Sequence, residues 1–66
     1  MNDLDADGVI LVDRHEAAGR LSISVSEIDR LRRIGEIVAR RHGRRILFPV
    51  AELQRYADTL PADENR

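Results

Sequence analysis

The chain has 66 residues and a mass of 7.5 kDa, which allows one small domain and leaves no room for a second. It has no cysteine, which excludes a disulfide framework, a thiolate metal site and a cysteine nucleophile. It also lacks an apolar run of the ~18 residues that a transmembrane helix needs, and its first residues are acidic, so we expect a soluble intracellular protein without a signal peptide.

The net charge is only −1, but the charges are segregated along the chain. Residues 1–13 carry four Asp and no base, whereas residues 30–45 carry seven Arg against a single acid, Glu36. All eleven basic residues are Arg, which binds phosphate and guanine through two parallel hydrogen bonds. The middle of the chain therefore has the charge of a surface that binds an anionic partner, although the protein as a whole is nearly neutral.

We predict three parts of the chain. Residues 1–8 form an acidic tail, residues 9–60 form the folded domain, and residues 61–66 form a second polar tail. The domain opens with residues 9–12, whose side chains are all aliphatic and mostly β-branched. This run predicts one short strand.

Two capping signals predict two successive helices. Asp13 is followed at the required distance by Glu16, and Ser24 is followed in the same way by Glu27. Gly35 is suited to the left-handed position that ends the second helix. The apolar positions that we assign to the core are Ala17, Ala18 and Leu21 in the first helix and Ile28, Leu31 and Ile34 in the second. Two short helices joined by about three residues, the second rich in Arg, predict a helix-turn-helix.

Residues 36–48 contain two β-prone runs around His42 and Gly43, which predicts a hairpin, because Gly supplies the positive φ angle of a tight turn. Pro49 is suited to the first position of a last helix, and apolar residues then recur at helical spacing up to Pro61. The predicted order is strand, helix, helix, hairpin, helix. The fold class that follows is α+β, a small winged helix-turn-helix in which the hairpin is the wing.

The sequence resembles excisionase-like, MerR-type winged-helix domains across the segment HEAAGRLSISVSEIDRLRRIGEIVARRHGRRILFPVAELQRYA, within residues 9–58. The residues that carry the resemblance are Ala17, Ala18, Leu21, Ile23, Ser24, Arg30, Leu31, Gly35, Gly43, Arg44, Arg45, Pro49, Leu53 and Tyr56. Two positions depart from the family pattern. Ser22 stands where Gly is common, and Val25, the first exposed residue of the second helix, stands where a polar or basic residue is common.

The resemblance implies a protein that binds double-stranded DNA, takes no cofactor or metal and catalyses no reaction. It implies that the second helix enters the major groove and that the wing lies along the adjacent minor groove or its phosphates. The predicted DNA-binding residues are Val25, Ser26, Asp29, Arg30 and Arg33 in the second helix and Arg40, Arg41, His42, Arg44 and Arg45 in the wing. Arg30 is the expected base or phosphate contact, and Asp29 is expected to accept from cytosine or to pair with Arg33. The local charge agrees, because arginines that neutralise phosphates release counterions from DNA.

The resemblance also implies a specific role, that of an excisionase or recombination directionality factor of a phage or other integrated element. Such a protein would bind repeated sites beside the attachment site in a bacterial nucleoid, alone or with further copies of itself, and bend the DNA. It would then assist a tyrosine integrase in excision. A small phage or bacterial transcriptional regulator with the same domain is the alternative, and the sequence contains no feature that decides between the two.

Other motifs are incomplete. Asp3, Asp5 and Asp7 match the first half of a calcium loop, but Arg14 stands where a bidentate Glu is required. A zincin-like HExxH pattern begins at His15 and fails at Gly19, where the second His is needed. A calcium-responsive or protein-binding module without a nucleic-acid role remains a third hypothesis, and an acidic tail that weakens non-specific DNA binding is the simpler interpretation of the aspartates.

Overall fold

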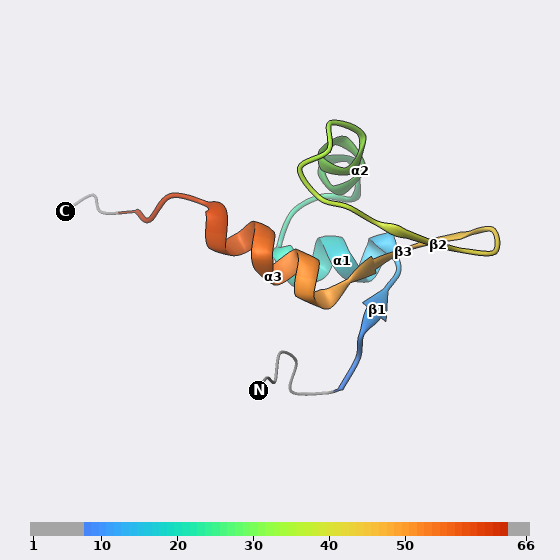
Figure 1. Ribbon diagram of the computed structural model, residues 1–66. Helices are drawn as coiled ribbons and strands as arrows, with labels where there is room; N and C mark the ends of the chain where they lie inside the picture. The colour runs from blue at the N-terminus through green and yellow to red at the C-terminus, as the bar shows by residue number, and fades with distance from the viewer. Residues whose placement is uncertain (1–7, 64–66) are drawn as a thin grey trace.

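The computed structural model describes residues 8–63. Within this range lie six elements, in the order β1 (Leu11–Val12), α1 (Arg14–Leu21), α2 (Val25–Arg33), β2 (Arg40–His42), β3 (Arg45–Pro49) and α3 (Val50–Thr59) (Figure 1). The strands form one antiparallel sheet of order β1-β3-β2. α1 packs against both α2 and α3, and the β2–β3 hairpin, which we call the wing, projects away from the helices (Figure 1). The predicted α+β winged helix-turn-helix is confirmed. The predicted acidic tail, including Asp3, Asp5 and Asp7, lies outside the described residues apart from Gly8.

The core is built from aliphatic side chains around a single aromatic ring. Phe48 of β3, Ile28 of α2 and Ile37, which follows α2, are the largest fully buried side chains. Ala17 and Ala18 are also buried, and their small side chains allow α1 to lie close to its neighbours. The complete buried cluster is Val12, Ala17, Ala18, Ile28, Leu31, Ile37, Phe48, Val50 and Leu53. Every element except β2 contributes to this cluster, so the outer strand of the wing stands off the core.

Both predicted helix starts are confirmed. Asp13 Oδ1 accepts a hydrogen bond from the Glu16 N–H at 2.8 Å and begins α1. The turn to α2 consists of residues 22–24 and contains Ser22 in the left-handed conformation, with φ 59° and ψ 38°. The Ile23 N–H donates to the Ala18 carbonyl at 3.0 Å, which closes the end of α1. Ser22 thus has a backbone conformation that favours glycine. Glycine is also the residue that the pattern described above commonly has at this position.

One predicted core position is wrong, because Ile34 is 56% exposed. Gly35 does adopt the expected left-handed conformation, with φ 84°, and reverses the chain immediately after Ile34. The N–H groups of Glu36 and Ile37 then both donate to the Leu31 carbonyl, at 2.9 and 3.3 Å. This tight reversal brings Ile37, 1% exposed, into the core in place of Ile34.

The strands are shorter than predicted at both edges of the sheet. β1 has only two residues, because its partner β3 ends at Pro49 and the Ile10 carbonyl accepts instead from the Val50 N–H at 2.8 Å, where α3 begins. β2 begins at Arg40, so residues 36–39 connect α2 to the wing without strand pairing. Pro49 is the last residue of β3 and the N-cap of α3, and not the first residue of the helix as predicted, because its ψ of 134° is extended.

Candidate nucleic-acid interface

α2 is anchored through one face and presents the other to solvent. Its N-cap is Ser24, whose Oγ accepts from the Glu27 N–H at 3.0 Å, as the sequence predicts. Ile28 and Leu31 are buried, and Val25 is half-buried against the core, so the prediction that Val25 is exposed is wrong. Val25 precedes Ile28 by three residues and therefore lies beside it on the helix. The exposed residues of α2 are Ser26, Arg30, Arg32 and Arg33.

Asp29 on the outer side of α2 forms an ion pair with Arg14, the first residue of α1. Arg14 Nη1 lies 2.8 Å from Asp29 Oδ2, and the side chains are 48% and 26% exposed. The predicted alternative, a pair between Asp29 and Arg33, is wrong, because the packing of α1 on α2 brings Arg14 within reach from a different helix. The interaction joins the two helices and neutralises a carboxylate that would otherwise repel DNA phosphates.

Arg30 is bound by a carboxylate of its own helix. Its Nε and Nη2 atoms donate to the two carboxylate oxygens of Glu27 at 2.9 and 2.6 Å. These hydrogen bonds lower the pKa of Glu27 and raise the pKa of Arg30, and the nearby Tyr56 and Glu36 raise the pKa of Arg30 slightly further. Arg30 must therefore give up at least one of its hydrogen bonds to Glu27 before it binds a base or a phosphate.

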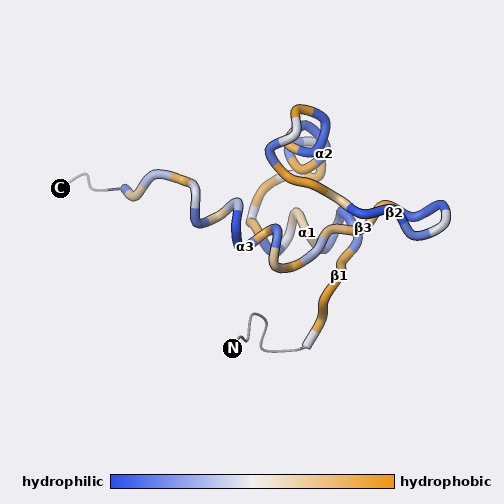
Figure 2. Tube along the Cα trace, viewed as in Figure 1, coloured by the Kyte–Doolittle hydropathy of each residue, from blue (hydrophilic) through white to orange (hydrophobic). Residues whose placement is uncertain are grey.

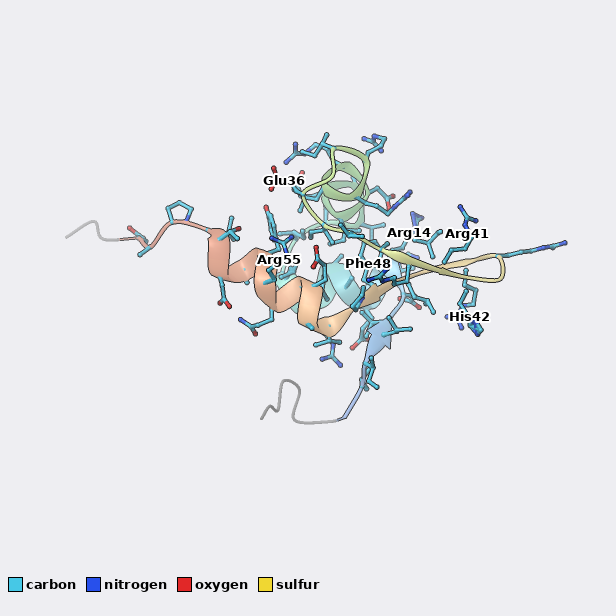
Figure 3. All side chains as sticks on the ribbon, viewed as in Figure 1. Arg14, Glu36, Arg41, His42, Phe48 and Arg55 are labelled. Carbon is cyan, nitrogen blue, oxygen red and sulfur yellow. The ribbon has the colours of Figure 1, made fainter. Side chains whose placement is uncertain are left out.

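The two faces of the wing carry different side chains. The register of its strands is Arg40↔Leu47, Arg41↔Ile46 and His42↔Arg45. Paired residues in a sheet lie on the same face, and successive residues alternate between faces. Arg41 therefore shares a face with Ile46, whereas Arg40, His42 and Arg45 share the opposite face. In Figure 3, Arg41 and His42 project to opposite sides of the wing, and Arg41 projects to the side on which α2 lies.

The wing ends in a two-residue turn, Gly43 and Arg44, between the paired residues His42 and Arg45. Gly43 has a φ of 64°, which confirms the predicted role of this glycine, and a glycine at the first central position is typical of type II′ hairpin turns. All five polar residues predicted for the wing, Arg40, Arg41, His42, Arg44 and Arg45, are exposed, and Figure 2 shows a hydrophilic tip.

The arginines fall into two groups. Arg14, Arg20, Arg30 and Arg55 form ion pairs with carboxylates. Six others form no ion pair and no side-chain hydrogen bond within residues 8–63, and we call them the arginine surface: Arg32, Arg33, Arg40, Arg41, Arg44 and Arg45. They all lie on the last turn of α2 or on the wing. An unpaired guanidinium can bind a phosphate without first giving up a protein carboxylate, so this surface is the candidate anion-binding site of the described chain.

The two parts of the arginine surface meet at an open hollow between the end of α2 and the wing. Its lining residues are Arg32, Gly35, Ile37, Val38, Ala39, Arg40, Arg41 and Ile46. Arg32 is absent from the residues predicted from the sequence, which assigned the outer face to Arg30 and Arg33. Helical periodicity marks Arg32 as exposed, but only the position of the wing gives it this particular neighbourhood.

A pair of α3 residues holds the connection between α2 and the wing. Arg55 donates to both carboxylate oxygens of Glu52, at 3.0 and 2.8 Å, and to the Glu36 carbonyl at 2.6 Å. Glu52 Oε2 in turn accepts from the Val38 N–H at 3.0 Å. The hydrogen bonds from Arg55, together with the one from Val38, lower the pKa of Glu52. Figure 3 shows Arg55 beside the segment that connects α2 to the wing. The Glu52–Arg55 pair satisfies two backbone groups in a segment that has no strand partner and thereby positions the wing relative to α2.

The described residues offer little other chemistry. No group of three or more His, Cys, Asp or Glu side chains within residues 8–63 is placed to hold a metal ion. No described helix has the length and apolar character required to cross a membrane. His15, the start of the incomplete HExxH pattern, is exposed on the first turn of α1.

Comparison with protein-family models matches residues 12–60 to a helix-turn-helix domain, a DNA-binding family that includes excisionase-like members. The matched range runs from β1 through α3 and contains all the interface residues described above. Domains of this family are typically non-enzymatic. The comparison with curated proteins found no match, and neither did the comparison with solved structures. Because the match covers most of the chain and the structure has the corresponding helices, the protein belongs to the helix-turn-helix domain family of DNA-binding proteins.

Proposed function

We propose that this protein is a sequence-specific, architectural DNA-binding protein that acts as an excisionase. The observation that carries the proposal is the arginine surface, six unpaired guanidinium groups on two adjacent elements of a helix-turn-helix domain. A protein that makes about 6–10 phosphate contacts loses roughly 10³–10⁵ in affinity between 50 and 200 mM salt. We therefore expect tight, strongly salt-dependent binding to duplex DNA from a protein whose net charge is close to zero.

In the proposed complex the outer face of α2 enters the major groove. Ser26 and Arg33 lie near the centre of this face, because they are seven residues apart and so nearly aligned along the helix. Asp29 and Arg30 flank them. Ser26 and Arg33 form no ion pair within the described residues, so both are suited to contact base edges or phosphates directly. Asp29 and Arg30 would contribute after their pairs with Arg14 and Glu27 rearrange.

The wing would contact the adjacent minor groove or its phosphates through Arg40, Arg41, His42, Arg44 and Arg45. A helix and a wing that neutralise phosphates on the same side of a duplex favour bending towards the protein, which is the physical basis of the architectural role. Bending of attachment-site DNA by one or several copies would help a tyrosine integrase to run in the excisive direction. This last step is proposed from the resemblance to excisionases and from the family match.

Footprinting of the DNA that flanks the gene tests the proposal. We expect protection of direct repeats beside an integrase crossover site, and a circular-permutation mobility shift should report a bend on the same DNA. Protection at a promoter, without an effect on an integrase-dependent excision assay, would instead identify the alternative function, a transcriptional regulator. Failure to shift any duplex at low salt would contradict both.

A further inference from the structure

The hollow between α2 and the wing combines two kinds of surface. Arg32 borders it from the last turn of α2, and Arg41 borders it from β2. The remaining lining consists of Arg40, the neighbour of Arg41 in β2, of Gly35, and of apolar residues that include Ile46 and the half-exposed Val38. The hollow has a volume of about 310 Å³ and is open to solvent. A free inorganic anion is surrounded by water on all sides, whereas a phosphate in a nucleic acid is flanked by the carbon atoms of a deoxyribose. A hollow with arginines on one side and apolar side chains on the other therefore matches a phosphate together with its sugar.

The two arginines approach this space from different elements. Arg41 lies on the wing face that carries Ile46, which also borders the hollow. Arg40 lies on the opposite face. There it is close enough to Glu52 to lower the pKa of that carboxylate slightly, whereas Arg55 lowers it more. Arg32 and Arg41 have no ion-pair partner within residues 8–63. Two unpaired guanidinium groups on one hollow repel each other, and a shared anion between them removes this repulsion.

The apolar wall is held in place before any ligand binds. Gly35 and the two N–H groups that converge on the Leu31 carbonyl fix the start of the connection. The Glu52–Arg55 pair fixes its middle through Val38 and Glu36. A preformed site loses little conformational freedom on binding, so its contacts translate more fully into affinity.

We propose that this hollow binds one phosphodiester of the DNA backbone, held jointly by Arg32 and Arg41, with the neighbouring deoxyribose against Val38 and Ile46. The inference rests on the proposed DNA binding and adds a residue, Arg32, and a stoichiometry, two arginines on one phosphate. The hollow lies where the duplex would pass from the major groove occupied by α2 to the minor groove occupied by the wing. The shared phosphate would therefore fix the register between the two contacts.

Salt-dependent DNA binding of Arg32→Ala, Arg41→Ala and the double variant tests the stoichiometry. Each neutralised phosphate contributes about 0.9 to the slope of log affinity against log salt. We expect each single variant to lose clearly less than one unit of slope, because the remaining guanidinium still neutralises the shared phosphate. The double variant should lose about one unit. Arg20→Ala is the matched control, since it removes the same charge from α1, and we expect its slope to equal that of the wild type.

A loss of about two units in the double variant would assign the arginines to separate phosphates and overturn the proposal while leaving DNA binding intact. A full unit lost in each single variant, or an unchanged slope in the double variant, would overturn it in the same way. Absence of DNA binding in the wild type would refute the proposed function itself, so the two failures are distinguishable. Circular dichroism of each variant verifies the fold, and Arg32→Lys, which keeps the charge, should retain most of the slope.

A second measurement distinguishes the backbone from free phosphate. The amide resonances of Ala39 and Arg41 should shift on titration with a short duplex and should not saturate with inorganic phosphate at the same concentration and constant ionic strength. Saturation by inorganic phosphate at an equal or lower concentration would assign the hollow to a free anion and overturn the assignment to DNA.

Discussion

The helix and the wing of the interface carry their arginines in different electrostatic states. On α2, Arg30 is bound by Glu27, and Asp29 is bound by Arg14, so the outer face presents ion pairs together with unpaired groups. The wing presents only cations, with no carboxylate on either strand. The two elements also differ in their attachment, because α2 buries Ile28 and Leu31 whereas β2 has no buried residue.

This contrast assigns different physical tasks to the two elements. In the proposed complex the ion pairs on α2 would be exchanged for contacts with DNA. Only a base or phosphate in the right place would make that exchange favourable, so α2 is suited to discrimination between sequences. In the proposed complex the wing would bind phosphates without such an exchange, so it is suited to affinity that does not depend on sequence. The predictions below separate these tasks, beginning with the anchoring of α2.

The largest expected effect comes from the buried face of α2. Ile28→Ala should lower the free energy of unfolding by about 2–5 kcal/mol, because it empties a fully buried position. Ile34→Ala makes the same chemical change in an exposed residue next to the same helix and should alter it by less than about 0.5 kcal/mol. Urea unfolding followed by circular dichroism measures both. Equal losses would contradict the replacement of Ile34 by Ile37 in the core.

Arg30→Ala tests discrimination by α2. We expect binding to the cognate site to weaken roughly 10- to 100-fold and binding to random DNA to weaken much less, as for a residue that contacts a base. Glu27→Gln, which removes the partner of Arg30, should raise the affinity for random DNA, whereas Glu16→Gln on α1 should not. Competition mobility shifts give both affinities. Parallel losses on the two DNAs in Arg30→Ala would assign Arg30 to a phosphate, and wild-type behaviour would remove it from the interface.

The Glu52–Arg55 pair predicts a pH dependence of stability. The hydrogen bonds from Arg55 hold the pKa of Glu52 below its usual 4.5 in the folded protein. Its contribution is therefore present above pH 4.5 and is lost as the pH falls through the lower, folded value. Glu52→Gln should cost about 1 kcal/mol at pH 7, and its difference from wild type should shrink below about pH 4.5. Asp58→Asn, elsewhere on α3, is the control. A difference that does not change with pH would contradict this role of the carboxylate.

Arg44→Ala and Arg45→Ala test the wing. Each should weaken binding to specific and random DNA alike and lower the salt slope by about one unit, because each removes one phosphate contact. Stability should stay within about 0.5 kcal/mol of wild type, since both side chains are exposed. Fluorescence anisotropy at several salt concentrations measures the slope. An unchanged slope in both variants would exclude the wing tip from the interface.

The smallest effect concerns the turn before α2. Ser22 has a left-handed backbone, so Ser22→Gly should raise the free energy of unfolding by about 0.5–1 kcal/mol. The reverse change on the wing, Gly43→Ser, should lower it by a similar amount, because Gly43 also has a positive φ and no atom lies within 4 Å of a Cβ built there. Thermal unfolding measures both. A destabilised Ser22→Gly variant would show that the hydroxyl group of Ser22 contributes more than the backbone strain costs.

Much of the fold follows from signals that act within a few residues. The caps at Asp13 and Ser24, the turn at Gly43 and the buried pair Ile28 and Leu31 depend on interactions over two to four positions, and the structure confirms each of them. Local periodicity failed at Ile34, because the competing residue, Ile37, reaches the core only through a reversal that no helical pattern describes.

Local properties of the sequence, namely caps, turn residues and charge, are sufficient to predict a small winged helix-turn-helix with its arginines gathered on the second helix and the hairpin. Three of the ion pairs are equally local, because Arg20, Arg30 and Arg55 each bind a Glu three or four positions earlier in the chain. The packing of the elements adds the relations between distant positions. Arg14 reaches Asp29 from another helix, Arg55 holds the connection before the wing, and Arg32 shares a hollow with Arg41 across nine positions of the chain. These relations depend on the packing of α1, α3 and the wing around α2, and the electrostatic state of a guanidinium follows from what that packing places beside it.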